Sequence, residues 1–384
     1  MDFPFDKEWI VYQLREHCNF KCNERYTEDV EISVIPIGEN GFVANVFLII
    51  ASAGSGQTDI AAKIVGRIVD NLEEVNDSDR FKETVHKREC LFYERFGCHL
   101  PTVPTVYNFG PSVAGRKPGF LLMESLLGKG TSFHFSQSLT VPQLLELARF
   151  IGHIQAHSLA MEDKTWIDAF EQPNFDLEAE KNYVLKTLDI FTYFRNGIFK
   201  EELNVFSSYV QKNFMKFSQY DFHKSLDIPS VLVHGDLWTH NVLWRTEDGS
   251  ATDKLEKVFD FQGAHAGNPS WDLTRLLVVC TDCDIRTSHW EKVFAEYYTT
   301  LATSLHEKKQ ELPFTLAQVK QCYSHVFLNQ TIQFCNLMVD QEMELKAAKS
   351  EDLLFMEARF EKLLKRLKSV ICDAMNVFSN PAFA

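Results

Sequence analysis

A short polar segment between two apolar runs, at 231–244, most constrains how this chain can fold. The runs V-L-V and V-L-W predict two short strands, and the loop H-G-D-L-W-T-H-N between them carries Asp236 and, five positions later, Asn241. A further apolar run, V-F, ends in Asp260. Oxygen-bearing side chains at strand ends in this order are typical of a phosphoryl-transfer site.

Phosphoryl transfer needs the residue types that this segment provides. A carboxylate accepts or orients the proton of the attacking hydroxyl, and other oxygens hold the Mg²⁺ ions that bridge nucleotide phosphates. Asp236 suits the first role, whereas Asn241 and Asp260 suit the second. An amide oxygen binds a cation without adding another negative charge. The H-x-D-x-x-x-x-N spacing is that of a kinase catalytic loop, and D-F-Q stands where protein kinases carry D-F-G.

The same residue types also occur in ordinary turns, so H-G-D by itself would leave a plain turn open. The full order of features favours the site instead. A strand is followed by H-G-D, by Asn at the fifth position, by two more predicted strands, the second ending in Asp, and by Asp272 at the start of a predicted helix.

The segment 234–273, with H-G-D-L-W-T-H-N-V-L-W, V-F-D-F-Q and N-P-S-W-D-L, resembles the choline/ecdysteroid kinase-like (CHK kinase-like) family. That family lies within the aminoglycoside/choline phosphotransferase group of the protein kinase-like superfamily, whose members phosphorylate small-molecule hydroxyls with ATP and Mg²⁺. The resemblance implies that Asp236 is the catalytic base and that Asn241 and Asp260 bind metal. It also implies that His234 and Asp272 support the loop.

The pattern and the resemblance together predict an α+β fold of the two-lobed protein kinase-like type. Residues 1–123 are expected to form a small ATP-binding lobe with a five-stranded antiparallel β-sheet and one key helix. Residues 124–384 are expected to form a larger, mainly helical lobe, with helical insertions at 161–227 that shape the acceptor site. The periodicity predicts strands at 31–37, 42–50, 60–65, 105–109 and 120–123, and helices at 78–96 and 141–160.

Lys63 and Glu89 are predicted to form an ion pair. Lys63 lies in an apolar strand, like the V-A-I-K lysine that contacts nucleotide phosphates in kinases. Glu89 lies on the apolar stripe of the predicted helix, and a buried carboxylate needs a partner. The other members of that stripe are Phe81, Val85, Phe92 and Phe96. Two alternatives stay open: Lys63 on an edge strand facing solvent, or Glu89 paired with a neighbour such as Arg88.

Three further residues are candidates for nucleotide binding. Gly38 and Gly41 lie in the turn between the first two strands, where glycines let backbone amides approach phosphates, although Asn-Gly is also an ordinary hairpin turn. The later motifs favour the phosphate loop, but F-V-A-N at 42–45 departs from the small residues usual in the family. Glu124 follows the fifth strand, where the family's hinge presents backbone groups to adenine.

The composition is that of an ordinary globular protein, since 45% hydrophobic content over 384 residues suffices for two separate cores. A formal net charge of −14 argues against a nucleic-acid partner. The sequence begins without the layout of a signal peptide, and its apolar runs are too short to span a bilayer. Nine cysteines include only a lone C-x-x-C at 280–283. We therefore expect a cytoplasmic protein with reduced thiols and no evident protein partner.

The short distance between the motifs at Asp260 and Asp272 distinguishes small-molecule kinases from protein kinases. Only twelve positions separate Asp260 from Asp272 and no A-P-E follows, which leaves no room for the activation segment of a protein kinase. The sequence therefore favours an ATP- and Mg²⁺-dependent phosphotransferase that acts on a hydroxyl of a choline-like, steroid or xenobiotic alcohol. The alternative that stays open, because of the irregular glycine loop, is a catalytically silent kinase fold that binds a small molecule or a protein.

Overall fold

The computed structural model describes residues 3–20, 29–37, 43–54, 56–69, 71–97, 100–170, 177–217, 221–349 and 352–378. The chain forms two compact units. The first unit comprises Met1–Thr131, Arg245–Ala251 and Glu256–Ala264, and the second comprises Ser132–Trp244, Thr252–Leu255 and His265–Ala384.

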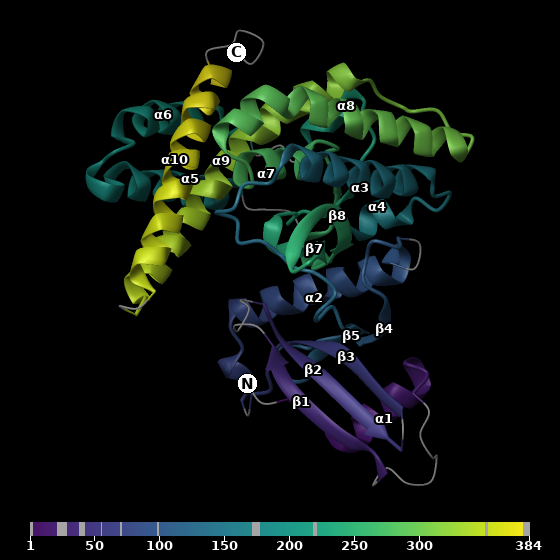
Figure 1. The fold of residues 1–384 in the computed structure, drawn as a ribbon. Helices are drawn as coiled ribbons and strands as arrows, with labels where there is room; N and C mark the ends of the chain where they lie inside the picture. Colours follow the sequence, from purple (N-terminus) through teal and green to yellow (C-terminus); the bar gives the residue numbers. More distant parts are fainter. Residues whose placement is uncertain are drawn as a thin grey trace. The chain divides into compact units, whose positions relative to one another are not determined.

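The first unit contains a five-stranded sheet in the order β1-β2-β3-β5-β4, shown in purple to blue in Figure 1. Its strands are β1 (Glu31–Ile37), β2 (Ala44–Ala53), β3 (Gly56–Val65), β4 (Val106–Gly110) and β5 (Gly119–Glu124). Every pair of neighbours is antiparallel, and β3 is the central strand. The predicted α+β class, with its five-stranded antiparallel sheet, is confirmed.

Helix α1 (Lys7–His17) covers one face of this sheet. Successive side chains of a strand point to opposite faces, so every second residue of β2, β3 and β5 joins the same core. This core includes Ile10, Val11 and Leu14 of α1 with Phe47, Ile49, Ala51, Ile60, Ala62, Ile64, Phe120 and Leu122. Lys63 stands between Ala62 and Ile64 and therefore points to the other face.

Helix α2 (Asp77–Arg95) begins with a capping box, in which the side chains of Asn76 and Asp79 each accept a hydrogen bond from the backbone N–H of the other residue. Glu89 and Phe92 are buried as the stripe predicts, but Phe81 is 49% exposed. In that turn the buried side chain is Asp79, and a residue two positions later lies on the opposite side of a helix. The apolar face of α2 therefore begins one turn later than the sequence predicts.

The second unit is mainly helical (Figure 1). Helix α3 packs against α8, α9 packs against α7 and α10, and α5 packs against α6. The helical segments expected within 161–227 are present as α4, α5 and α6. The helices are α3 (Val141–Ala160), α4 (Thr165–Ala169), α5 (Leu177–Tyr193), α6 (Lys200–Phe217), α7 (Trp271–Val279), α8 (Cys283–Glu307), α9 (Leu316–Ala347) and α10 (Leu353–Phe378).

Two short antiparallel pairs complete the fold. Strands β6 (Val231–Val233) and β9 (His265–Gly267) pair in one, and β7 (Val242–Glu247) and β8 (Ser250–Val258) pair in the other. All three residues of β6 are fully buried, and Leu232 donates its backbone N–H to Ser158 Oγ of α3 at 3.0 Å. The H-G-D loop therefore begins at a buried strand that is hydrogen-bonded to the buried Ser158 of α3.

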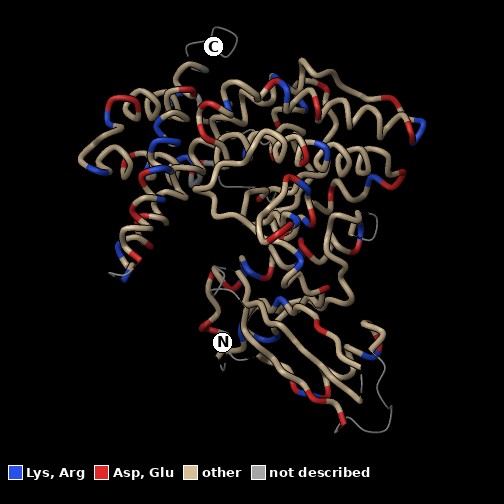
Figure 2. Tube along the Cα trace, in the orientation of Figure 1, with Lys and Arg blue, Asp and Glu red and all other residues tan. Residues whose placement is uncertain are grey.

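Charged residues of both signs are interspersed along the trace of each unit (Figure 2). The net charge of −14 is therefore spread over the chain and does not come from a single acidic segment. In the described parts of the chain, no helix has the length and apolar character needed to cross a bilayer.

We expect Gly119→Ala to destabilise the first unit. A Cβ at this position would lie 2.4 Å from His86 Nε2 and 2.8 Å from the backbone nitrogen of Ser112. Overpacking of this kind typically costs about 1–3 kcal/mol. Gly56→Ala is the matched control, because its Cβ would meet only the Ala53 carbonyl oxygen, at 3.5 Å. Urea unfolding should show a lower midpoint for Gly119→Ala alone, and equal midpoints would contradict the packing around β5.

Candidate active site

The predicted site residues are divided between the two units. The first unit holds Lys63, Glu89, Glu124 and Asp260, and the second holds His234, Asp236, Asn241 and Asp272. Gly38 and Gly41 lie outside the described residues.

In the first unit, Lys63 lies between two carboxylates. Its Nζ is 2.6 Å from Glu89 Oε2 and 2.6 Å from Asp260 Oδ1. Lys63 is 8% exposed and Glu89 is 1% exposed, so these contacts replace water around the charged atoms. Lys63 belongs to the central strand and faces α2, and the ion-pair partner of Glu89 is Lys63 rather than its neighbour Arg88.

The two carboxylates keep this buried lysine charged. Burial alone would lower the pKa of Lys63, but Asp260 and Glu89 outweigh that effect and raise it above the ordinary value. Burial raises the pKa of Glu89, while Lys63 acts in the opposite direction. With both carboxylates ionised, the cluster carries one more negative than positive charge, which favours a further cation nearby.

Two stacked rings attach the segment after Asp260 to α2. The ring centroids of Phe92 and Phe261 are 3.6 Å apart with an interplanar angle of 5°, and both residues are fully buried. Phe92 follows Glu89 by three positions, so one face of α2 contacts both Lys63 and Phe261. Asp260 has φ +66° and ψ +59°, in the left-handed region that Asp tolerates better than most residues. The sequence did not predict this stacking, although Phe92 on the buried stripe was the available signal.

The Glu124 side chain is engaged within the first unit. It accepts hydrogen bonds from Lys129 Nζ at 2.7 Å and from the backbone N–H of Thr105 at 2.8 Å, and it lies 2.9 Å from Lys257 Nζ. Burial would raise the pKa of Glu124, but these three partners outweigh it and lower the pKa to about 2. The side chain therefore stays ionised and fixes the end of β5.

In the second unit, Asp272 at the start of α7 holds the H-G-D loop. Its Oδ2 accepts a hydrogen bond from the His234 backbone N–H at 2.8 Å, and its Oδ1 accepts one from Gly235 at 3.0 Å. Asp272 is fully buried, and burial raises its pKa against the opposing effects of His234 and the two N–H groups. Gly235 has φ +82°, a conformation that glycine adopts without strain.

Two more hydrogen bonds fix the backbone of Asp236. Its N–H donates to His234 Nδ1 at 3.3 Å, and its carbonyl oxygen accepts from Asn241 Nδ2 at 2.9 Å. Since Nδ2 of Asn241 is the donor, Oδ1 is the amide atom that can bind a cation. The loop thus presents the Asp236 carboxylate and the Asn241 carbonyl from one hydrogen-bonded turn.

One contact to Asp236 was not predicted from the sequence. Arg275 Nη2 donates to Asp236 Oδ1 at 2.6 Å. Arg275 is 7% exposed, whereas the Asp236 side chain is 30% exposed. Arg275 follows Asp272 by three positions on α7, and this helical spacing after the expected loop anchor was the signal that could have found it.

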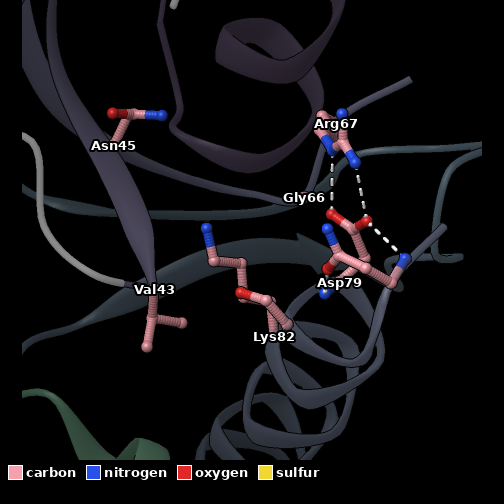
Figure 3. Close-up of a pocket in the computed structure, with 8 residues that line it drawn as sticks. Val43, Asn45, Gly66, Arg67, Asp79 and Lys82 are labelled. Carbon is pink, nitrogen blue, oxygen red and sulfur yellow. Dashed lines mark hydrogen bonds and ion pairs between the residues drawn. The ribbon is translucent and has the colours of Figure 1, made fainter. Parts of the chain in front are cut away.

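The first unit also contains a cavity of about 190 Å³ at the start of α2 (Figure 3). Arg67 donates to both carboxylate oxygens of Asp79, each at 3.0 Å, and the Lys82 side chain extends from α2 toward Val43 and Asn45. The lining residues are Val43, Asn45, Gly66, Arg67, Asn76, Ser78, Asp79 and Lys82. This cavity is therefore lined by Lys82 together with the Arg67–Asp79 ion pair.

The described residues include no group of three or more His, Cys, Asp or Glu side chains arranged to hold a metal ion. The two cysteines of the C-x-x-C segment are not part of any such group: Cys280 is buried and Cys283 is exposed.

Two curated relatives come from Caenorhabditis elegans. Uncharacterized oxidoreductase dhs-27 is 28% identical over 231 residues, which are 59% of this chain and 28% of that protein. Uncharacterized kinase-like protein D1044.1 is 25% identical over 302 residues, which are 76% of each chain. The chain thus spans little more than a quarter of the first relative and about three quarters of the second.

An aminoglycoside phosphotransferase and a choline kinase are among the solved structures that resemble this chain. A GDP complex of a point mutant of aminoglycoside 2'-phosphotransferase-IIIa matches with a TM-score of 0.53 and 15% identity, covering 96% of this chain and 99% of that one. Choline kinase from Cryptosporidium parvum matches with a TM-score of 0.51 and 13% identity, covering 99% and 100%. At these identities the comparison establishes the fold, and it confirms the predicted protein kinase-like fold.

The family model described as Uncharacterized oxidoreductase dhs-27 (DUF1679) matches residues 61–379, a range that includes Lys63, Asp236 and Asp260. The chain therefore belongs to this family, and its fold is that of the aminoglycoside phosphotransferases and choline kinases.

Proposed function

We propose that this protein is a small-molecule kinase that uses ATP and Mg²⁺ to phosphorylate a hydroxyl of a small organic acceptor. Similar solved structures include an aminoglycoside phosphotransferase and a choline kinase, and one curated relative is named kinase-like. The observation that carries the proposal is the buried contact of Lys63 with Glu89 and Asp260. A lysine held by a helix glutamate binds nucleotide phosphates in the kinase fold, and the aspartate that follows binds Mg²⁺.

The residues present fit Mg²⁺. The Asp260 side chain is 26% exposed and uses Oδ1 for Lys63, and Asn241 offers its amide oxygen. Mg²⁺ in such sites takes one or two protein oxygens, with phosphate oxygens and water completing its coordination. When bound, the ion would neutralise charge on the nucleotide phosphates. The excess negative charge of the Lys63 cluster favours the same cation.

In this proposal the second unit supplies the group that acts on the acceptor. Asp236 accepts a hydrogen bond from the acceptor hydroxyl and takes its proton as the new O–P bond forms and the bond to the ADP leaving oxygen breaks. Phosphoryl transfer depends more on positioning than on base strength. The bonds of His234, Asn241 and Asp272 within the loop would provide that positioning.

The proposal covers the acceptors that the sequence analysis favours, namely choline-like, steroid and xenobiotic alcohols. All of these have the required hydroxyl. The word oxidoreductase in the family description comes from the dhs-27 protein, and this chain matches only 28% of the length of that protein. The sequence contains no G-x-G-x-x-G, the fingerprint of a dinucleotide-binding strand and helix. Hydride transfer is therefore not part of the proposal.

A second candidate is a catalytically silent kinase fold that binds a small molecule or a protein. One observation favours it: the Asp236 carboxylate is paired with the buried Arg275. That ion pair already engages Oδ1, one of the two carboxylate oxygens that could accept the proton of a hydroxyl.

Asp236→Asn should abolish turnover while leaving nucleotide binding intact, because the amide keeps the size of the side chain and loses the proton acceptor. ADP release from Mg·ATP, measured over a panel of small hydroxyl compounds, should fall by a factor of about 10²–10⁴ with the compound that stimulates the wild type. Asp221→Asn, at an exposed carboxylate of the same unit, is the control. Wild-type turnover in Asp236→Asn would refute the assignment of the base.

Lys63→Met should weaken ATP binding by about 10–100-fold, since a charge-assisted hydrogen bond contributes about 1.5–3 kcal/mol. Lys82→Met, in the cavity of Figure 3, should leave the dissociation constant unchanged. Fluorescence titration with a labelled nucleotide measures both. Because Lys63→Met leaves Glu89 unpaired, the double variant Lys63→Met/Glu89→Leu is measured as well. The opposite ranking of Lys63→Met and Lys82→Met would place the phosphates at the cavity.

Mg·ATP should stabilise the protein against thermal unfolding, because a ligand at a hundredfold its dissociation constant adds about 2.7 kcal/mol to the unfolding free energy. The shift should require Mg²⁺. Stabilisation without turnover of any acceptor would support the silent binding protein, and the absence of both would contradict nucleotide binding altogether.

A further inference from the structure

We propose that Arg275 is a positioning residue for Asp236, which holds the carboxylate in the orientation that meets the acceptor hydroxyl. The inference rests on the proposed function, in which Asp236 acts on the acceptor. The observations that lead to it concern one helix, one buried guanidinium and its two partners in the second unit.

Helix α7 carries two residues that contact the loop. Asp272 binds the backbone N–H groups of His234 and Gly235, and Arg275 binds the Asp236 side chain. Residues three positions apart lie on the same side of a helix. All nine residues of α7 are buried, so both contacts come from an element that is packed on every side. The helix therefore fixes the loop backbone and the carboxylate together.

The guanidinium is itself held in one orientation. Nη2 donates to Asp236 Oδ1 at 2.6 Å, and Nη1 donates to Gln330 Oε1 of α9 at 3.3 Å. Gln330 is fully buried, and the Trp238 ring lies 6.0 Å from the guanidinium carbon. Two partners on different nitrogens of a rigid planar group set its plane as well as its position. A lysine at this place would supply the charge without that orientation.

The exposure of the two partners fits a positioning role. Arg275 is buried, whereas the Asp236 side chain is 30% exposed and so remains accessible to a ligand. The terminal torsion of an Asp side chain has a broad energy profile, so an Asp without a fixed partner samples many orientations. In a positioned reaction, an error of about 1 Å costs about 10²-fold in rate. Holding one carboxylate oxygen removes that freedom.

A second buried pair in the same unit provides the matched control. Arg286 of α8 lies 2.6 Å from Asp373 and also donates to Ser369, and it is 1% exposed. It resembles Arg275 in burial, in partner type and in distance, but no predicted site residue contacts it in the described structure. The Arg286→Met variant therefore measures how far the loss of a buried ion pair away from the predicted site residues changes kcat.

The test compares Arg275→Met, Arg275→Lys and Arg286→Met, together with Asp236→Asn and the double variant Asp236→Asn/Arg275→Met. ADP release from Mg·ATP is measured with water as the acceptor and with the compound that stimulates the wild type. Arg275→Met should lower kcat by about 10–100-fold with KM for ATP changed less than about twofold. Arg275→Lys should restore part of the loss. Arg286→Met should keep the wild-type kcat.

The double variant separates positioning from a structural role. If Arg275 acts through Asp236, Arg275→Met should cost nothing further in the Asp236→Asn background. An equal factor in both backgrounds, or a wild-type kcat in Arg275→Met, would overturn the inference while leaving the proposed function intact. If circular dichroism shows that Arg275→Met does not fold, Gln330→Leu replaces it and should lower kcat several-fold. A wild type that turns over neither water nor any compound would overturn the proposed function, and this inference with it.

Discussion

The arrangement of the first unit depends on the buried ammonium of Lys63. Taking such a charge out of water costs several kcal/mol, which only close partners offset. Those partners come from two different elements, α2 through Glu89 and the segment after β8 through Asp260. Three elements are therefore held at one atom. Removing Lys63 would leave the buried Glu89 carboxylate without its ion-pair partner, and breaking a buried pair in this way typically costs about 3–5 kcal/mol. The Phe92–Phe261 stack adds an apolar contact between the same two elements.

The second unit uses the same principle with the signs reversed. The buried group there is the Asp272 carboxylate, and two backbone N–H groups of the loop satisfy it. Its place in the first turn of α7 is favourable because carboxylates are stabilised at helix N-termini. One side chain thus stabilises the helix start and determines the path of the loop that carries Asp236.

The pattern of apolar and capping residues predicted correctly those strands and helices whose ends are marked in the sequence itself. The strand at 31–37 and the helix at 141–160 have the predicted bounds, the latter because Thr140 and Gln143 form a capping box around Pro142. The contact of Lys63 with Glu89 could be predicted because the strand and the helix each carry one charged residue among apolar neighbours, and two buried charges of opposite sign need each other. Phe81 was placed wrongly, because periodicity does not say which turns of a helix are covered. Arg275 was missed for a related reason. Its spacing from Asp272 places it on the side of the helix that contacts the loop, but spacing does not show that it is buried or that its partner is Asp236, 39 positions earlier.

The choice of cation at each carboxylate fits the role that we propose for it. Lysine is a compact charge on a flexible stem whose three donors can be shared among partners, so Lys63 can contact Asp260 and Glu89 and still serve nucleotide phosphates. Arginine has a rigid planar fork, so Arg275 fixes the direction of the Asp236 carboxylate. A metal-binding aspartate needs a neighbour that can be shared, whereas an aspartate that orients a hydroxyl needs one that keeps it still. If lysine and arginine changed places, each carboxylate would still face a positive charge. However, Asp260 would lose a partner that can be shared, and Asp236 would lose one that fixes its direction.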